Sequence, residues 1–160
     1  MIKDDTRQTI KVVAWLVAAL VLLYFATLVI FYRASRPERS QTQEINRVAR
    51  QKTPITTITK NYHLDRGVNS YALMGVGKNK QKYYFVYLPG SKRAYLLPAQ
   101  KGLSEAAIRA KFTAKTPGEK ITKVNLGWYR GRAVWETTSK NYAGSYHYRL
   151  YDFKNGNLIG

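Results

Sequence analysis

One uncharged stretch of 21 residues, Val12 to Tyr32, constrains the fold of this chain more than any other feature of its sequence. As an α-helix, which rises about 1.5 Å per residue, it reaches about 30 Å, the thickness of the hydrocarbon core of a bilayer. Thirteen of its residues are Val, Leu, Ile or Phe, and together they favour membrane insertion by roughly 4–8 kcal/mol. The sequence therefore predicts a transmembrane helix over residues 12–32, preceded by a short tail over residues 1–11.

A cleavable signal peptide has a shorter apolar core, of about 7–15 residues, and a small-residue cleavage site after it. The stretch here is longer and leads into the letters FYRASR over residues 31–36, which contain no Ala-x-Ala site. An uncleaved anchor is therefore favoured over the two alternatives, a signal peptide and a buried core helix.

The charges near this stretch leave its orientation open. Three Lys and Arg residues precede it, and five follow it within residues 33–50. For short loops this excess places the carboxyl-terminal side in the cytoplasm, but long domains are translocated largely regardless of charge. The residues alone do not decide which side of the membrane the larger part of the chain occupies.

The composition of the remaining chain excludes several classes of protein. The chain has no cysteine, so it has no disulfide scaffold, no thiolate metal site and no cysteine nucleophile. Residues 33–160 hold 24 of the 27 Lys and Arg residues but 7 of the 9 Asp and Glu residues, a net formal charge of +17. A field of that size favours an anionic partner: nucleic acid, anionic lipid headgroups or, outside a bacterial cell, phosphate-rich wall polymers.

The chain after the apolar stretch begins with a polar segment, residues 33–53. Its apolar positions Ile45, Val48 and Ala49 are spaced as one narrow face of a helix, and Pro54 ends that helix. We interpret the segment as either a solvated stalk or a first helix docked on the next domain. Residues 54–100 form a first unit, in which runs rich in Thr, Tyr, Val and Leu predict antiparallel strands over residues 55–62, 70–76, 81–88 and 92–97.

A second unit, residues 101–160, starts with a predicted helix. Ser104 is a favourable N-cap, Glu105 places a negative charge in the first turn, and the helix ends before Pro117. Strands are predicted over residues 121–129, 132–139 and 145–153, with an Asn155-Gly156 hairpin turn into residues 157–159. This pattern repeats the first unit at a spacing of about 63 residues. The sequence therefore predicts an α+β fold, an N-terminal transmembrane helix plus tandem units of a helix packed on an antiparallel sheet.

Three pieces of the second unit resemble a known family: Gly102 to Glu105 at the helix start, Trp135-Glu136 in the middle strand, and Tyr151 to Phe153 before the last turn. The chain resembles the TseB-like family of Gram-positive bacteria, also called the YpmB family, with its PepSY-like and cystatin-like domains. The resemblance implies a single-pass membrane protein with a cytoplasmic tail and an extracytoplasmic carboxyl-terminal domain. It also implies a role in cell wall elongation, through contact with a class B penicillin-binding transpeptidase.

Groups that carry out catalysis are sparse in this sequence. Residues 33–160 have seven carboxylates, no two within five residues of each other, and two histidines, His63 and His147, which we interpret as surface or edge residues. The letters GVGK over residues 75–78 lack the spacer and the terminal Ser or Thr of a phosphate-binding loop. The sequence therefore predicts a protein that is not an enzyme, with no catalytic residue, no metal ligand and no cofactor.

Two sets of charged residues are candidate contacts. The basic set is predicted to surround one set of turns and to contact anionic lipid or wall polymer: Lys78, Lys80, Lys82, Lys92 and Arg93. Glu136 and Asp152 are candidate contacts to a protein partner, because they lie beside apolar strand positions in a chain poor in acids. Each acid has an alternative structural role, a salt bridge with a lysine or, for Asp152, a cap on the turn before Asn155.

The sequence leaves alternatives for function. The favoured one is a membrane-anchored binding protein that regulates wall synthesis. The runner-up is a membrane-tethered nucleic-acid-binding protein of the cytoplasm, which the net charge and the arginines after the apolar stretch favour. A third, inhibition of a peptidase, rests on the PepSY resemblance alone.

Overall fold

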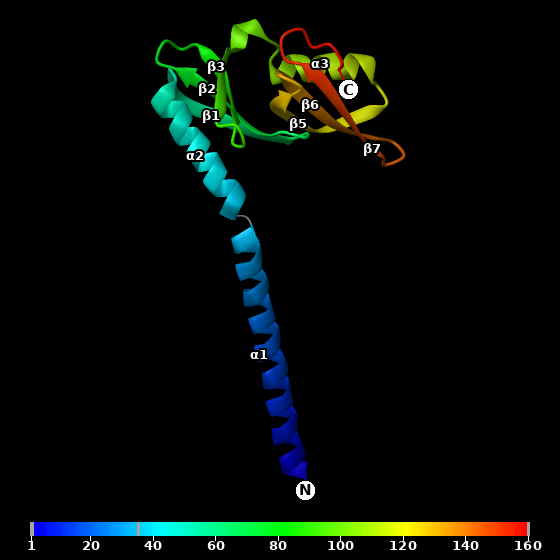
Figure 1. The fold of residues 1–160 in the computed structure, drawn as a ribbon. Helices are drawn as coiled ribbons and strands as arrows, with labels where there is room; N and C mark the ends of the chain where they lie inside the picture. Colours follow the sequence, from blue (N-terminus) through cyan, green and yellow to red (C-terminus); the bar gives the residue numbers. More distant parts are fainter. Residues whose placement is uncertain (1, 35, 160) are drawn as a thin grey trace. The chain divides into compact units, whose positions relative to one another are not determined.

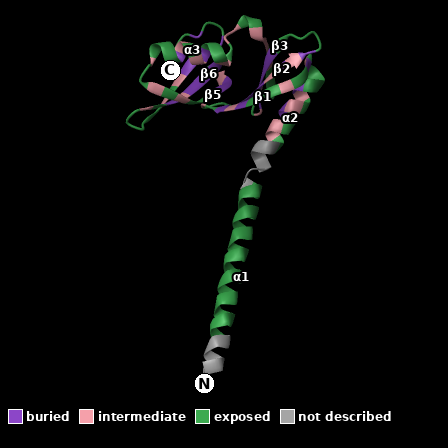
Figure 2. Ribbon diagram, turned by 180° about the vertical axis from the view of Figure 1, so that it is seen from behind, coloured by how far each residue is buried: buried purple, intermediate pink, exposed green. Residues whose placement is uncertain are grey.

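The computed structural model describes residues 2–34 and 36–159, and the chain divides into two compact units, residues 1–41 and 42–160. The first unit contains helix α1, Ile2–Ala34 (Figure 1). Its residues Gln8–Arg33 have a mean hydropathy of 2.6 in their most apolar window, and none of that window is buried. The described side chains of α1 are accordingly exposed along its length (Figure 2). A buried core helix is therefore wrong, and α1 fits a membrane anchor or a signal sequence.

Helix α2, Arg36–Lys52, continues into the second unit, where its apolar face is covered. Ile45 is 2% exposed and Ala49 is fully buried, and both pack against buried side chains of the first sheet. The helix is closed by Thr53, whose N–H and hydroxyl both donate to the carbonyl of Ala49. Within the second unit the segment is a docked helix and not a solvated stalk, because its three apolar positions face one way.

The first sheet is an antiparallel meander in the order β1-β2-β3-β4. Its strands are β1 Ile55–Asp65, β2 Asn69–Gly77, β3 Lys82–Leu88 and β4 Arg93–Pro98. All four predicted strands are confirmed, and β1 runs three residues beyond its predicted end at Tyr62. The GVGK letters form the end of β2 and the start of the β2–β3 turn, so they make a hairpin.

The second sheet follows a short 3₁₀ helix, η1 Ala99–Lys101, and helix α3, Glu105–Lys115. The predicted cap is confirmed, since the hydroxyl of Ser104 accepts the N–H of Ala107 at 3.2 Å. The sheet order is β5-β6-β7, with strands β5 Glu119–Tyr129, β6 Arg132–Asn141 and β7 Tyr146–Asp152.

The predicted closing hairpin is only partly formed. A turn does occur, because the Gly156 N–H donates to the carbonyl of Asp152 and Gly156 has φ +65°. The chain after it makes a single bridge, Tyr151 with Leu158, and no further strand. The predicted return of the chain over residues 157–159 is therefore confirmed in part: the Asp152 N–H donates to the carbonyl of Asn157 and the Ile159 N–H to that of Leu150, but among the described residues the pairing is limited to this one bridge.

The two sheets and α3 share one core. Trp135 of β6 is fully buried, and its ring meets the edges of Tyr62 and Tyr84 from the first sheet at centroid distances of 5.5 and 5.4 Å. Its indole N–H donates to the carbonyl of Leu103, just before α3. A side chain at Gly127 of β5 would overlap Leu64 of β1, so these strands cross in close contact. Each half would be marginal alone, and the shared core joins them.

Candidate interaction surfaces

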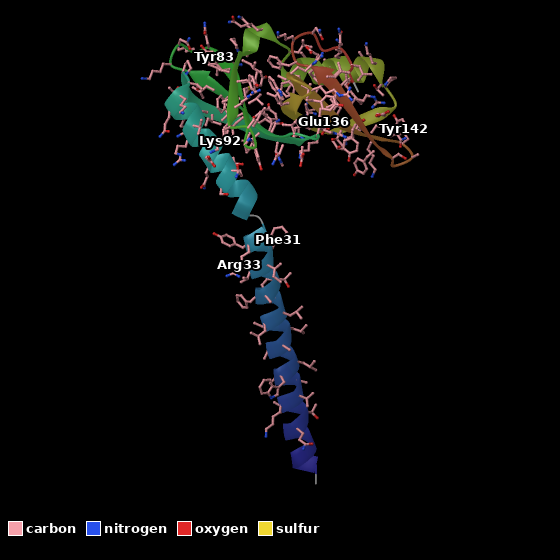
Figure 3. The ribbon with its side chains drawn as sticks, viewed as in Figure 1. Phe31, Arg33, Tyr83, Lys92, Glu136 and Tyr142 are labelled. Carbon is pink, nitrogen blue, oxygen red and sulfur yellow. The ribbon has the colours of Figure 1, made fainter. Side chains whose placement is uncertain are left out.

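The five basic residues predicted to surround one set of turns lie in two groups. Lys78 and Lys80 are in the β2–β3 turn and Lys82 begins β3, whereas Lys92 and Arg93 lie at the opposite end of that strand. Figure 3 labels Tyr83 and Lys92, which mark these two ends. A strand of seven residues separates them by about 20 Å, because each residue rises about 3.4 Å. The prediction of a single cluster is wrong, since successive turns of a meander alternate between the ends of the sheet.

Glu136 lies on β6 with its side chain 8% exposed. Its carboxylate accepts a hydrogen bond from the guanidinium of Arg66, in the β1–β2 turn, and that guanidinium also lies over the ring of Tyr148 at 4.9 Å. The structural role predicted for Glu136, a salt bridge, is therefore confirmed, with an arginine in place of a lysine. The pair joins the β1–β2 turn of the first sheet to strand β6 of the second.

Asp152 closes the turn after β7. Its carboxylate accepts the backbone N–H groups of Lys154 and Asn155 at 2.8 and 3.3 Å, which confirms the predicted turn cap. The other carboxylate oxygen lies 3.7 Å from the guanidinium of Arg132. Asp152 thereby fixes the turn beside β6.

A polar cluster that sequence reasoning missed surrounds Glu119, the first residue of β5. Arg149 of β7 donates two hydrogen bonds to its carboxylate, at 2.7 and 2.8 Å, and the hydroxyl of Ser139 donates a third. His147 Nδ1 lies 2.9 Å away. These hydrogen bonds, that of Arg149 first, hold the pKa of Glu119 at about 2, and the carboxylate in turn raises the pKa of Arg149. The alternating pattern of the sequence predicted that Ser139, His147 and Arg149 lie on strands, but not that they meet. No local feature of the sequence pointed to Glu119.

A second missed cluster surrounds Glu105, at the start of α3. Its carboxylate accepts hydrogen bonds from Lys60 and Tyr62 of β1 at 2.6 and 3.0 Å, and from Arg109 one helical turn on. Burial acts to raise the pKa of Glu105, but the hydrogen bonds from Lys60, Arg109 and Tyr62 outweigh it, so the pKa is lowered. Burial, together with this carboxylate, raises the pKa of Tyr62. The cluster ties α3 to the first sheet.

The two histidines lie at sheet edges. His63, on the edge strand β1, stacks on Tyr71 at a centroid distance of 4.4 Å and contacts Asn69 through its Nε2. His147, on the edge strand β7, is 41% exposed in its side chain. Among the residues that the structure describes, no group of three or more His, Asp or Glu side chains is arranged to hold a metal ion.

Three large aromatic side chains are exposed on the β6–β7 hairpin. Tyr142, labelled in Figure 3, is 94% exposed, and Tyr146 and Tyr148 are each 55% exposed. Lys140 lies over the ring of Tyr146 at 5.3 Å. Aromatic residues such as tyrosine are enriched at protein interaction surfaces, so this hairpin is a candidate surface of that kind.

Comparisons with known proteins give a likeness of fold. No family model matches the sequence, and no curated protein matches it. Among solved structures, the chain is similar to the YpmB protein from Bacillus subtilis, with a TM-score of 0.63 and 21% identity over 74% of this chain and 93% of that one. The chain therefore has a YpmB-like α+β fold, as the sequence resemblance implied.

Proposed function

We propose that this chain is a membrane-anchored, extracytoplasmic binding protein that regulates cell wall elongation by docking on a class B penicillin-binding transpeptidase. The observation that carries the proposal is the combination of an apolar, unburied helix α1 with a domain of YpmB-like fold. The resemblance of the second unit to the TseB-like family supplies the process and the class of partner. The anchor holds the domain at the membrane, where such a transpeptidase is found.

The charges of the domain support binding in place of catalysis. Four of its carboxylates are engaged in ion pairs within the domain: Glu105, Glu119, Glu136 and Asp152. A general base must lie within reach of a substrate, whereas these four carboxylates hold strands and turns in place. Because these carboxylates are engaged within the domain, its surface is basic and suited to binding a partner.

The basic surface supports a location next to anionic headgroups or wall polymers. Lys78, Lys80 and Lys82 at one end of β3 and Lys92 and Arg93 at the other are exposed. Screening limits exposed charges to about 8 Å at physiological salt, so these side chains act on surfaces that the anchor has already brought close.

The test is cross-linking in growing cells followed by purification of the full chain through a carboxyl-terminal tag. Enrichment of a class B transpeptidase is expected. The matched control keeps residues 1–41 and replaces the remainder with an unrelated folded domain, and this control should lose the enrichment. Equal enrichment with the control, or none with the full chain, would contradict the proposal.

The net charge of +17 on residues 33–160 favours a second candidate, a membrane-tethered protein that binds nucleic acid in the cytoplasm. Such binding would weaken steeply with salt, because each neutralised phosphate releases counterions. Retention of the full chain on single-stranded DNA at about 0.15 M salt, together with a cytoplasmic domain, would favour this candidate over the first.

A further inference from the structure

Two adjoining hollows lie beside the first sheet, where β4 is an edge strand. Their volumes are about 530 and 620 Å³, and both are lined by Trp128 and Gly131 of the β5–β6 hairpin. Arg93 and Tyr95 line one hollow, while Leu96 and Leu97 line the other. We call this pair of hollows the β4 groove.

The groove follows the edge of β4 and not one of its faces. Three consecutive residues, Leu96, Leu97 and Pro98, line the same hollow. Successive side chains of a strand point to opposite faces, so consecutive residues meet one hollow where it runs along the strand edge. The backbone N–H and C=O groups on that side of an edge strand have no partner within their own sheet, and they form a template for another strand.

The groove has an apolar and aromatic lining. Leu96 is 37% exposed, although it is a large aliphatic residue. Tyr95 stacks on Trp128 with ring centroids 3.9 Å apart and planes 13° apart, which fixes both rings where the hollows meet. Arg130 and Gly131 have φ of +45° and +81°, a combination typical of a tight hairpin turn, which sets the position of Trp128 beside β4.

The rim of the groove is cationic. Its charged lining consists of five cations and one carboxylate: Arg93, Lys101, Arg130, Arg132, Lys154 and Asp152. Asp152 is already engaged by Arg132 and by the turn that it caps. Among the side chains that the structure describes, no carboxylate lies at ion-pair distance from Arg93, Lys101, Arg130 or Lys154. The groove therefore has an excess of positive charge that its own domain does not neutralise.

We propose that the β4 groove binds an extended, acidic peptide segment of a protein partner, which adds to the first sheet as a strand beside β4. The charge of the rim selects carboxylates, the aromatic and aliphatic lining takes an apolar side chain, and the strand edge supplies backbone hydrogen bonds. A strand of six residues gives about 20 Å of edge. Pairing ends at Pro98, which has no N–H to donate. An edge that pairs through its backbone favours a peptide over a lipid or a nucleic acid.

This proposal rests on the proposed function in one respect, that the partner is a protein. The binding test uses the full chain in nanodiscs and an eight-residue fluorescent peptide that alternates Glu with Val. Saturable binding is expected, and loss of binding is expected for the same peptide with Gln in place of Glu. A peptide of the original sequence with alternate backbone nitrogens methylated should also fail, because it cannot pair along the strand edge.

The groove is tested by a pair of charge reversals. Arg93→Glu with Lys101→Glu, one change in each hollow, should weaken peptide binding about tenfold or more. The matched control is Lys120→Glu with Lys123→Glu, which makes the same change in net charge on β5, outside the groove and outside the basic surface, and should leave binding unchanged. All four side chains are exposed, and thermal unfolding of each variant verifies that it is folded.

Equal loss of peptide binding in both double variants would overturn the proposal. So would binding of the methylated peptide as tight as that of the original. Complete displacement of the peptide by single-stranded DNA or by anionic vesicles at matched charge would also overturn it. The two proposals fail separately. If the Arg93 and Lys101 reversals leave transpeptidase enrichment intact in cells, the groove fails and the proposed function stands. If the peptide binds to the groove but the transpeptidase is not enriched in cells, the proposed function fails and the groove stands.

Discussion

The two halves of the domain follow the same plan but end differently. The first residues of β1 and β5, β2 and β6, and β3 and β7 are separated by 64, 63 and 64 residues. The fourth position is a six-residue strand, β4, in the first half and a single bridge at Leu158 in the second. One repeated pattern therefore yields a first half with an open strand edge at β4 and a second half whose last segment forms a single bridge.

The halves also differ in what covers their sheets. The first sheet packs α2 on one face and the shared core on the other. The second sheet contributes Trp135 to the shared core, while its opposite face carries the Arg66–Glu136 pair and the exposed ring of Tyr148. The first half is thus a covered layer with a free edge, and the second half has a partly open face.

The largest effect should come from removing the side chain that joins the halves. Trp135→Ala should lower the free energy of unfolding by about 3–5 kcal/mol, because it opens a cavity among rings from both sheets. Urea denaturation of the full chain in micelles measures this, with Tyr142→Ala as the control, which should change stability by less than about 0.5 kcal/mol. A loss below about 1 kcal/mol for Trp135→Ala would show that the halves do not depend on a shared core.

The next effect tests helix α2, which packs on the outer face of the first sheet and has no counterpart in the second half. Ile45→Ala should lower the free energy of unfolding by about 3 kcal/mol, within the range for truncating a buried isoleucine, because Ile45 is 2% exposed where it packs against the first sheet. Gln43→Ala, an exposed change on the same helix, should have little effect in the same denaturation experiment. Equal stabilities of the two variants would mean that α2 is a stalk after all.

A smaller loss is expected where β1 crosses β5. Gly127→Ala should destabilise by about 1–3 kcal/mol, because its Cβ would overlap Leu64 and the hydroxyl of Ser70. Gly90→Ala is the matched control, since a Cβ there meets no atom within 4 Å. If the Gly127 variant were as stable as the control in thermal unfolding, the two strands would not be in close contact.

The smallest effect concerns acid stability in the second half. The pKa of Glu119 is lowered to about 2 from its ordinary 4.5, so its ion pairs contribute fully above about pH 5 and are lost as the pH falls toward 2. Glu119→Gln should therefore flatten the decline of stability between about pH 5 and pH 2 relative to the unmodified chain. Unfolding midpoints measured across this range test the prediction, with Glu44→Gln on α2 as the control. Parallel profiles for all three proteins would contradict it.

Local features of the sequence predicted most of the fold. The apolar spacing of Ile45, Val48 and Ala49 predicted α2, and Ser104 marked the start of α3, because caps and periodicity act within a few residues. Both sheets were predicted as short antiparallel runs. The pairing after Gly156 is limited to one bridge, which the sequence did not predict, because a turn signal does not state how many residues pair after it.

The charged clusters were less accessible to prediction. Arg66 and Glu136 are 70 residues apart, and Glu119 meets Arg149 across 30 residues, so only the packing of the strands brings them together. The basic residues were assigned to one cluster because they are close in sequence, but β3 separates them. The β4 groove combines an edge strand with a hairpin from the other half, and no local pattern contains both.

The proposed function depends most directly on the side of the membrane that the domain occupies. The chain has no cysteine, so single cysteines can be introduced without background. Tyr142→Cys, at a side chain that is 94% exposed, and Thr6→Cys, in the amino-terminal tail, would each be treated in intact cells with a maleimide that does not cross membranes. If the domain is extracytoplasmic, the Tyr142→Cys variant is labelled in intact cells and the Thr6→Cys variant only after permeabilisation. The reverse pattern would contradict the proposed function and place a domain of net charge +17 in the cytoplasm.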